Sequence, residues 1–266
     1  MPELPEVETI KRELEKAVLH KKIIRVAVHN DKVIKGYSSL AFTKGLQDCV
    51  INNIIRKGKL LILELSCGKS LAIHLRMTGQ LVYPGTASQS RVSFGFSDGT
   101  TLDFNDRRLL GELRLVDDWR SLKFIKELGQ EPFDISVDEF KRKLSGKKTK
   151  IKALLLDQTF ISGIGNLYAA EALFRARIHP LRPANSLSER EKELLFKEII
   201  AVLREAIEHK GSSIDQYIQL SGKSGGYARY HKVYGKEGRP CIVCGNKIQR
   251  ISLGGRGTYF CPKCQK

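Results

Sequence analysis

Hydrophobic residues near the start of the chain recur at helical spacing. Val7, Ile10, Leu14 and Val18 stand three or four positions apart, which places them on one face of a helix, and Pro5 suits its first turn. Short runs of β-favouring residues follow, several of them separated by Gly or Asp-Gly turns, over residues 23–28, 60–65, 92–96 and 100–104. The pattern predicts an antiparallel β domain with a helix packed on it.

The pattern changes in the second half of the chain. After Glu131-Pro132 the β signals largely end, and an apolar helical segment spans residues 151–157. A long helix begins at Ser188, where Glu191 three positions later completes a capping box, and it ends before Gly211. A boundary between a β-rich part and a helical part is therefore predicted near residue 132.

Length and composition describe an ordinary globular protein. The 266 residues, 41% hydrophobic and 28% charged, are most easily divided into two domains. No apolar run approaches the ~20 residues that a membrane-spanning helix needs, so no membrane partner is expected. Acidic residues stand where an export signal has a basic start and an apolar stretch, which predicts a cytoplasmic protein.

Positive charge is unevenly distributed. The chain has 46 Lys and Arg against 29 Asp and Glu, a formal net charge of +17. Residues 1–132 hold 21 basic and 16 acidic side chains, whereas residues 133–266 hold 25 and 13. A solvated surface scatters its charge, while a one-sided excess is typical of a protein that binds a polyanion. The balance favours a nucleic acid as the partner, ahead of an anionic membrane.

Four cysteines near the C-terminus form two closely spaced pairs, Cys241 with Cys244 and Cys261 with Cys264, and 16 residues separate the pairs. Thiolates at this spacing can hold one Zn²⁺ tetrahedrally and fasten a β-hairpin that has little core of its own. The alternative is free or disulfide-bonded cysteines, which the predicted location disfavours. Because four protein ligands leave no open position, the zinc is expected to be structural.

The two remaining cysteines, Cys49 and Cys67, stand outside any metal-binding pattern. An isolated Cys behaves as a small apolar residue and is among the residue types most often buried. We expect both to be buried, unpaired thiols.

A glycine-rich turn over residues 162–168 leads into a predicted helix. Gly163 and Gly165 let the backbone approach a ligand closely, and the N–H groups at a helix start attract phosphate. Such turns also serve simply to connect two helices, and this one lacks the strand and the third glycine of a dinucleotide site. A phosphate of the DNA backbone is the better ligand for it.

Pro2, Glu3 and Glu6 allow two interpretations. The ordinary one is a frayed terminus whose acids complement the dipole of the first helix. The other is an imino-acid nucleophile. After removal of Met1, Pro2 presents a secondary amine that can attack a sugar carbon and form an iminium, and a neighbouring carboxylate can move protons. Composition and spacing alone favour the ordinary interpretation.

Several segments together resemble one family closely, the bacterial formamidopyrimidine-DNA glycosylases of the superfamily that includes endonuclease VIII. The opening residues 1–9, MPELPEVET, are similar to the N-terminal signature of that family. Residues 56–59, 74–79, 158–168 and 254–264 match further family segments in the same order. The resemblance covers essentially the whole chain and reverses the preference for a frayed terminus.

The resemblance implies an α+β fold in three parts. An N-terminal catalytic β-sandwich with flanking helices is expected over residues 1–132, a helix–two-turn–helix DNA-binding domain over residues 133–234, and a zinc-finger β-hairpin over residues 235–266. The implied partner is damaged double-stranded DNA, bound by a monomer in the bacterial cytoplasm at the nucleoid.

The implied reaction excises oxidised purines, 8-oxoguanine and formamidopyrimidines, and then cleaves the abasic strand by β,δ-elimination. By resemblance, Pro2 attacks the sugar C1′ and forms a Schiff base, Glu3 is the acid–base residue, and Glu6 is a supporting carboxylate. The resemblance also places Lys59 among the catalytic residues. The resemblance also assigns phosphate contacts to Lys59, Asn166 and Arg256, and the filling of the gap left by the extruded base to Met77, Arg108 and Leu110.

Two features depart from the family pattern. Leu110 stands where the family usually has an aromatic residue, and a Lys-His-Asp-His-like segment near residues 88–91 is absent. Both concern the choice of lesion and of opposite base rather than the chemistry. An endonuclease VIII-like enzyme for oxidised pyrimidines is the alternative within the superfamily. A non-enzymatic zinc-finger DNA-binding protein is the alternative outside it.

Overall fold

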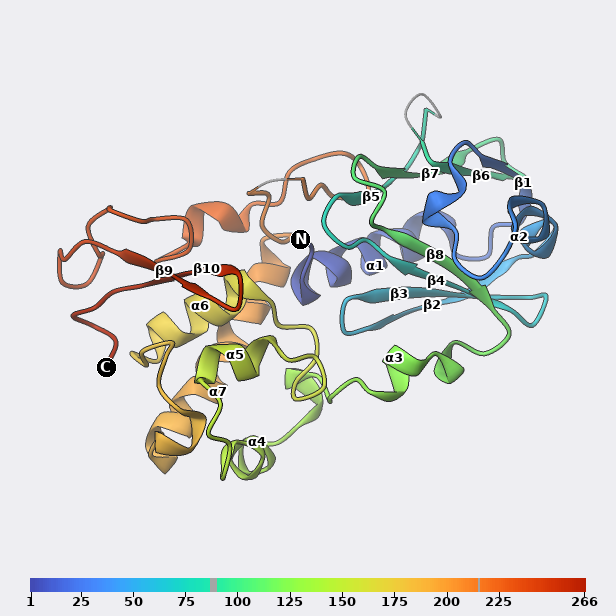
Figure 1. Cartoon of the computed structure of the whole chain (residues 1–266). Coiled ribbons are helices and arrows are strands. Elements are labelled where there is room, and N and C mark those ends of the chain that lie inside the picture. The colour runs from blue at the N-terminus through green and yellow to red at the C-terminus, as the bar shows by residue number, and fades with distance from the viewer. Residues whose placement is uncertain (87–89, 215) are drawn as a thin grey trace. The chain divides into compact units, whose positions relative to one another are not determined.

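The computed structural model describes residues 1–86, 90–214 and 216–266 (Figure 1). Ser88 and Gln89, where the family segment is missing, lie outside these residues. By packing, the chain divides into two compact units, one of residues 1–126 with 209–228 and the other of residues 127–208 with 229–266. The domain limits at residues 132 and 234 stay predictions, because packing groups residues by contact and not by their order in the chain.

The first unit contains two four-stranded antiparallel sheets. One sheet has the order β1 (Ile23–Val28), β6 (Val92–Phe96), β7 (Thr101–Asp106) and β5 (Gly79–Val82). The other has the order β2 (Ile51–Lys57), β3 (Leu60–Leu65), β4 (Ser70–His74) and β8 (Glu112–Val116). Its helices are α1 (Leu4–Val18), α2 (Ser39–Leu46) and α3 (Lys123–Lys126).

The two sheets and α1 share one hydrophobic core. Phe94 and Phe96 of β6 and Phe104 of β7 are at most 1% exposed, because alternate residues of a strand point to the same face. Val7 and Leu14 of α1 lie in the same cluster, as the helical spacing predicted. Two sheets that bury their inner faces against each other form a β-sandwich, so the predicted fold of this part is confirmed.

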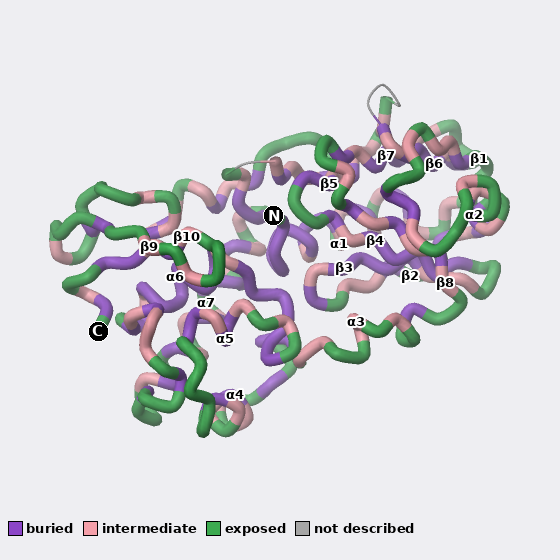
Figure 2. Tube along the Cα trace, in the orientation of Figure 1, coloured by how far each residue is buried: buried purple, intermediate pink, exposed green. Residues whose placement is uncertain are grey.

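Strand β3 is buried on both faces, which explains its continuous apolar sequence. Leu61 and Leu63 lie in the shared core, whereas Leu60 and Ile62 pack against Trp119 in a second cluster on the other side of the sheet. The tube in Figure 2 shows the strands of the first unit as largely buried segments between exposed turns.

Residues 209–228 belong to the first unit through core and backbone contacts. Tyr217 and Leu220 lie in the shared core. The Leu220 N–H donates to the Glu13 carboxylate at 2.8 Å, and the Leu220 carbonyl accepts from the Tyr83 N–H at 2.8 Å. These contacts explain why a segment that follows the long helix in sequence packs with the sandwich.

The second unit is helical and ends in a β-hairpin. Its helices are α4 (Val137–Leu144), α5 (Ile151–Leu156), α6 (Asn166–Arg175) and α7 (Glu189–Glu208), and the hairpin pairs β9 (Gln249–Leu253) with β10 (Arg256–Phe260). Short 3-10 turns at Asp31–Val33, Trp119–Ser121, Pro132–Asp134, Ala184–Ser186 and Tyr227–Tyr230 connect the elements of the chain.

The start of α7 confirms the capping box predicted from the sequence. The Ser188 N–H donates to the Glu191 carboxylate at 2.8 Å, and the Glu191 N–H donates to Ser188 Oγ at 3.3 Å. Each side chain thus satisfies a backbone donor that the helix itself leaves unpaired.

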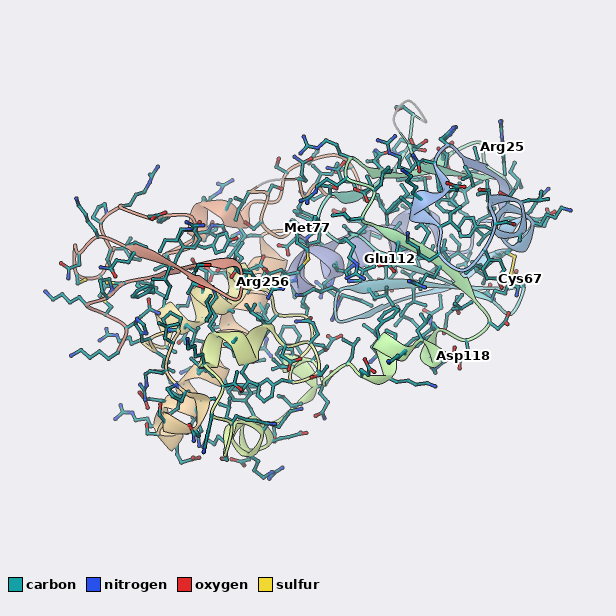
Figure 3. The ribbon with its side chains drawn as sticks, in the orientation of Figure 1. Arg25, Cys67, Met77, Glu112, Asp118 and Arg256 are labelled. Atoms are coloured by element: carbon teal, nitrogen blue, oxygen red, sulfur yellow. A yellow bond between two sulfur atoms is a disulfide. The ribbon has the colours of Figure 1, made fainter. Side chains whose placement is uncertain are left out.

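The prediction for Cys49 and Cys67 is wrong, since the two residues form a disulfide (Figure 3). Cys49 precedes β2 and Cys67 follows β3. Because these strands are antiparallel neighbours, the two cysteines lie at the same end of the pair, with their Cα atoms 5.5 Å apart. Cys67 is also exposed, so only Cys49 is buried as expected.

Among the residues that the structure describes, no helix is both long enough and apolar enough to cross a membrane.

Candidate functional site

The N-terminal carboxylates are buried and held by backbone donors. Glu3 is 5% exposed and Glu6 is 3% exposed. Glu6 Oε2 accepts from the Glu3 N–H at 2.8 Å, and Glu6 Oε1 accepts from the Ser212 N–H at 2.8 Å. Glu6 thus fixes the backbone of Glu3 at the start of α1 to the returning segment, so it can orient Glu3 while its own oxygens are engaged.

Gly211 makes this approach possible. Its backbone has φ +75°, and a Cβ there would stand 2.9 Å from Glu6 Oε1 and 2.9 Å from a ring carbon of Tyr217. Burial raises the pKa of Tyr217, and the charge of Glu6 adds to the effect. Tyr217 therefore stays protonated and donates to the Lys210 carbonyl at 2.9 Å.

Lys59 lies in the turn between β2 and β3, and an ion pair ties this turn to α1. The Arg56 guanidinium donates to Glu8 of α1 at 2.8 Å and to the Gly58 carbonyl at 3.0 Å. Burial acts to raise the pKa of Glu8, but the hydrogen bonds and charges of Arg56 and Arg12 outweigh it and lower the pKa. Glu8 is therefore ionised at neutral pH, and the pair connects the helix that carries Glu3 to the turn that carries Lys59.

The three predicted gap-filling residues lie on two loops of the first unit. Met77, 37% exposed, lies on residues 75–78 between β4 and β5. Leu110, 43% exposed, lies with Arg108 on residues 107–111 between β7 and β8. Apolar side chains that stand out from a folded surface to this extent are available to a partner.

The first of these loops rests on a neutral histidine and an ion-pair network. His74 Nδ1 accepts from the Arg76 N–H at 3.1 Å. Burial lowers the pKa of His74 to about 4, and the charge of Arg76 acts in the same direction. The Arg76 guanidinium binds Glu112 at 2.6 Å, and Arg114 binds the other oxygen of Glu112 at 2.8 Å. Figure 3 labels Met77 and Glu112 on this part of the chain.

In the second unit, the glycine-rich turn is braced by Gln158. The Gln158 side chain donates to the Ile164 carbonyl at 2.9 Å and accepts from the Gly163 N–H at 3.0 Å. Gly163 has φ +90°, a conformation that favours glycine. Asn166 is the first residue of α6, so the turn presents the N-terminus of that helix, as predicted.

The Asn166 side chain anchors the hairpin within this unit. Its amide nitrogen donates to the Gly257 carbonyl at 3.0 Å. Gly257 follows Arg256, which is the first residue of β10. The buried Lys152 of α5 donates to Thr258 Oγ1 at 2.9 Å. Two helices thus hold β10, and Arg256 is exposed beside the Gly254-Gly255 turn (Figure 3).

The four predicted zinc ligands gather at one point. The Sγ atoms of Cys241, Cys244, Cys261 and Cys264 lie within 4.8 Å of one another. Four thiols this close, with no disulfide among them, fit a tetrahedral Zn²⁺ at the usual Zn–S distance of about 2.3 Å. A zinc bound there would have no open position, so it would fasten the hairpin and take no part in chemistry.

A separate carboxylate holds the segment that enters the zinc-binding part. Glu171 of α6 is fully buried and accepts from the N–H groups of Lys232, Val233 and Tyr234 at 2.8 to 3.0 Å. Burial raises the pKa of Glu171, and these three donors act against it. The arrangement is a backbone anchor rather than an open acid–base site.

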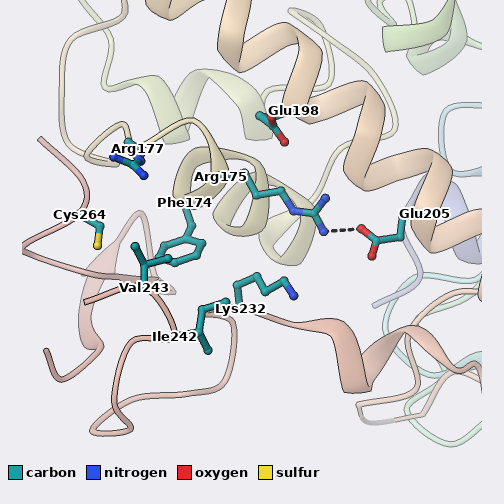
Figure 4. A pocket seen from close by; sticks show the side chains of 9 residues that line it. All are labelled: Phe174, Arg175, Arg177, Glu198, Glu205, Lys232, Ile242, Val243 and Cys264. Atoms are coloured by element: carbon teal, nitrogen blue, oxygen red, sulfur yellow. Dashed lines mark hydrogen bonds and ion pairs between the residues drawn. The ribbon is translucent and has the colours of Figure 1, made fainter. Parts of the chain in front are cut away.

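A pocket of about 430 Å³ in the second unit has the zinc ligand Cys264 among its lining residues (Figure 4). Arg175 and Glu205 form an ion pair on its wall, and the exposed Ile242 and Val243 form part of its rim. Of the predicted site residues it contains Cys264 alone, so it is not the predicted reaction site.

The predicted residues therefore divide between the units. The first unit contains Pro2, Glu3, Glu6, Lys59, Met77, Arg108 and Leu110. The second unit contains Asn166, Arg256 and the four cysteines. Four residues that support them were missed by the sequence interpretation: Glu8, Arg56, Thr78 and Asp106. All four stand within or beside the quoted motifs, but only their contacts show what they do.

Fold and site together define a class: a β-sandwich protein with a helical unit and a C-terminal zinc-binding hairpin. Three family models match it in order. The formamidopyrimidine-DNA glycosylase N-terminal domain matches residues 1–113, the H2TH domain of the same enzymes matches residues 128–217, and the zinc finger found in FPG and IleRS matches residues 238–266.

Whole proteins match over their full length as well. The formamidopyrimidine-DNA glycosylase of Pelotomaculum thermopropionicum is 45% identical over 274 residues, which cover 100% of this chain and 99% of the relative. The crystal structure of the MutM (Fpg) protein of Thermus thermophilus has a TM-score of 0.90 at 39% identity, covering 99% of this chain and 98% of that one. A Lactococcus lactis Fpg variant in complex with Fapy-dG-containing DNA has a TM-score of 0.91 at 37% identity, with both chains fully covered. This chain belongs to the formamidopyrimidine-DNA glycosylase family.

Proposed function

We propose that this protein is a base excision repair enzyme, a DNA glycosylase for oxidised purines with AP lyase activity. The observation that carries the proposal is the N-terminal arrangement, in which Pro2 precedes a buried Glu3 whose backbone is fixed by Glu6. A carboxylate next to an amine nucleophile can move the protons that the reaction requires, and a protein that only binds DNA does not need that function.

The substrates of relatives support the substrate class. The Lactococcus lactis variant described above is bound to Fapy-dG-containing DNA, and a further Lactococcus lactis Fpg structure holds abasic-site DNA. Family membership therefore favours oxidised purines over the oxidised pyrimidines of an endonuclease VIII-like enzyme.

The reaction follows from amine chemistry. With Met1 removed, the Pro2 nitrogen attacks the sugar C1′ and the bond from C1′ to the base breaks. The base leaves with the bonding electrons and takes up the proton that the Pro2 nitrogen loses. Glu3 gives a proton to the ring oxygen as the sugar opens, which leaves an iminium between Pro2 and C1′. Loss of a C2′ proton expels the 3′ phosphate, and a second elimination expels the 5′ phosphate.

The DNA-contact residues enter the proposal by type and position. Lys59, Asn166 and Arg256 would bind phosphates on either side of the damaged nucleotide, and Lys59 would also steady the reacting sugar. Met77, Arg108 and Leu110 would fill the gap that the extruded base leaves.

Zinc would hold the C-terminal hairpin through its four cysteines. The protein would act as a monomer on damaged duplex DNA in the cytoplasm, associated with the nucleoid through its net charge of +17.

Borohydride trapping tests the proposal. The protein is mixed with a duplex that contains 8-oxoguanine, and borohydride reduces any iminium to a stable covalent adduct. Protein with a free Pro2 should be trapped, and protein that retains Met1 should not, because its Pro2 nitrogen is an amide. Efficient trapping of the Met1-bearing form would refute Pro2 as nucleophile.

A Glu3→Gln variant separates chemistry from binding. It should bind the lesion duplex nearly as well as the parent, since a proton-transfer group and not a phosphate contact is removed, yet release no base. A parent protein that binds the duplex but is never trapped would identify a non-enzymatic zinc-finger protein instead.

A further inference from the structure

Two loops of the first unit carry the three residues proposed to fill the gap in the DNA. Residues 75–78 hold Met77, and residues 107–111 hold Arg108 and Leu110. We propose that Thr78 and Asp106 are positioning residues that clamp the two loops together, so that the three side chains present one preformed wedge. This inference rests on the proposed function and identifies the residues that keep that part of the site in shape.

The clamp is a compact hydrogen-bond network. The Thr78 hydroxyl donates to Asp106 Oδ1 and accepts from the Arg108 N–H at 3.1 Å. Asp106 Oδ1 also accepts from the Arg108 N–H at 3.1 Å, and Asp106 Oδ2 accepts from the Gly111 N–H at 2.6 Å. The Asp106 carboxylate thus joins Thr78, which follows Met77, to both ends of the loop that carries Arg108 and Leu110.

The network is shielded from water. Thr78 is 5% exposed and Asp106 is 1% exposed, whereas Met77 and Leu110 stand out at 37% and 43%. Buried hydrogen bonds to a charged acceptor are stronger than exposed ones, and a buried donor left unpaired is costly. The exposed tips of the wedge therefore stand on a rigid base.

Backbone conformation shows that both loops need to be held. Arg76 has φ +52° and Leu109 has φ +56°, the left-handed region that non-glycine residues seldom adopt. The Gly79 N–H closes the first loop on the Leu75 carbonyl at 2.9 Å. Residues kept in such conformations persist where the surrounding contacts fix them, and such sites are commonly functional.

Gly111 lets the second loop approach the carboxylate. A Cβ at this position would lie 3.0 Å from Asp106 Oδ2 and 2.7 Å from the Phe104 ring. The clamp thus depends on a glycine at the end of the loop as well as on its two side chains.

A preformed wedge favours base extrusion for an entropic reason. Side chains that enter a DNA stack from a mobile loop must be ordered at that moment, whereas side chains on a fixed loop are already ordered. Loosening the clamp should therefore slow steps that displace a stacked base and spare steps that do not.

A matched pair of variants tests this. Thr78→Val removes the hydroxyl and keeps the branched shape, whereas Thr78→Ser keeps the hydroxyl and removes a methyl group. Single-turnover excision of 8-oxoguanine from duplex DNA is compared with borohydride trapping on an abasic site in a single-stranded oligonucleotide. The second reaction uses the same amine chemistry but displaces no stacked base.

Thr78→Val should lower duplex excision by about tenfold or more and change single-strand trapping by less than about twofold, as expected from losing a buried hydrogen bond to the Asp106 carboxylate. Thr78→Ser should match the parent in both reactions. If Thr78→Val lowers both reactions equally, or neither, the clamp is refuted. If the parent protein is not trapped on either substrate, the proposed function fails and not the clamp.

A double-variant cycle adds a readout that general destabilisation would not change. In a Met77→Ala background, Thr78→Val should cost a smaller factor in duplex excision, because the tip that the clamp positions is already gone. Full additivity would overturn the proposal. Asp106→Asn, which replaces one acceptor oxygen with a donor, applies the same cycle if Thr78→Val does not fold.

Discussion

The sandwich of the first unit and the hairpin of the second unit are stabilised in different ways. The first buries aromatic and aliphatic side chains from two sheets and α1 in one large core, including Phe94, Phe96 and Phe104. The hairpin of the second unit packs on only a small cluster, in which the apolar residues Phe174, Val233 and Ile248 lie beside Cys241 and Cys261.

Polar contacts and metal ligands take the place of the missing core in the hairpin. Lys152 and Asn166 hold β10, Glu171 holds the segment before the cysteines, and the four thiols complete the arrangement. A segment with few apolar residues can be fixed in this way, but its stability then depends on a few specific groups.

Zinc removal should have the largest effect, and that effect should be confined to the second unit. A structural zinc site contributes on the order of 10 kcal/mol, and the small apolar cluster under the hairpin is too limited to replace it. Dialysis against a strong chelator, or Cys264→Ser, should expose residues 235–266 to protease and abolish duplex binding, while the first unit stays folded. Cys67→Ser is the control for zinc content, because it removes the Cys49–Cys67 disulfide but no zinc ligand and should leave about one zinc per chain. Undiminished DNA affinity without zinc would contradict the prediction.

Phe94→Ala should destabilise the first unit and leave the zinc-binding hairpin of the second unit intact. Truncating a fully buried Phe costs about 3–5 kcal/mol, so the free energy of unfolding measured by denaturant should fall by that amount in the first unit. Zinc content should not change. Phe133→Ala, at a residue 38% exposed, is the control and should cost little. A loss below about 1 kcal/mol for Phe94→Ala would mean that the core can collapse around the cavity.

Acid should weaken both units through one histidine in each. Burial lowers the pKa of His74 in the first unit and of His231 in the second to about 4, and nearby cations add to both effects. In the unfolded chain the His pKa is near 6.5, so between about pH 6.5 and pH 4 the unfolded chain binds more protons than the folded one. The stability that each neutral histidine contributes is therefore fully present above about pH 6.5 and is lost as the pH falls toward 4. Each histidine contributes up to about 1.4 kcal/mol per unit of pKa difference.

Denaturant unfolding at pH 7 and pH 5 measures this effect. His74→Asn keeps an acceptor near Nδ1 without titrating, so the stability of the first unit should depend less on pH in that variant. An unchanged pH dependence would exclude His74 as its source.

Arg256→Ala should produce the smallest change, and one in binding rather than in folding. Removing one phosphate contact should lower the slope of log affinity against log salt by about one unit, equally for different DNA sequences. Arg190→Ala, at an exposed cation on α7 of the same unit, is the control for general charge. Equal slopes for the parent and Arg256→Ala would remove Arg256 from the phosphate contacts.

Sequence periodicity predicted the elements whose signal is local. Apolar spacing or end residues were enough to identify helix α1, the capping box of α7 and strands β1, β3, β6 and β7 without help from neighbouring elements. Strands β2, β4, β5 and β8 were missed. Each contains polar as well as apolar residues, and their pairing in a sheet is what identifies them as strands.

The candidate site shows the same division. Types and spacing were enough to predict the four zinc ligands, and the resemblance supplied Pro2, Glu3 and Lys59. Neither could show that Glu6 accepts from two backbone groups, that Arg56 links Glu8 to the turn before Lys59, or that Thr78 and Asp106 join two loops. Each of these contacts joins segments that lie apart in the chain or depends on the direction of a single side chain.

Residue types and near-neighbour spacing were thus enough to predict the family, the local elements and the chemistry of the candidate groups. Tertiary structure alone decided that residues 209–228 return to the sandwich and that Cys49 lies beside Cys67. The first follows from the burial of side chains such as Tyr217, and the second from the pairing of neighbouring strands in a sheet. Neither can be predicted from the local pattern of residues. Contacts between segments far apart in the chain depend on how all of it packs, so they are seen only in the folded structure.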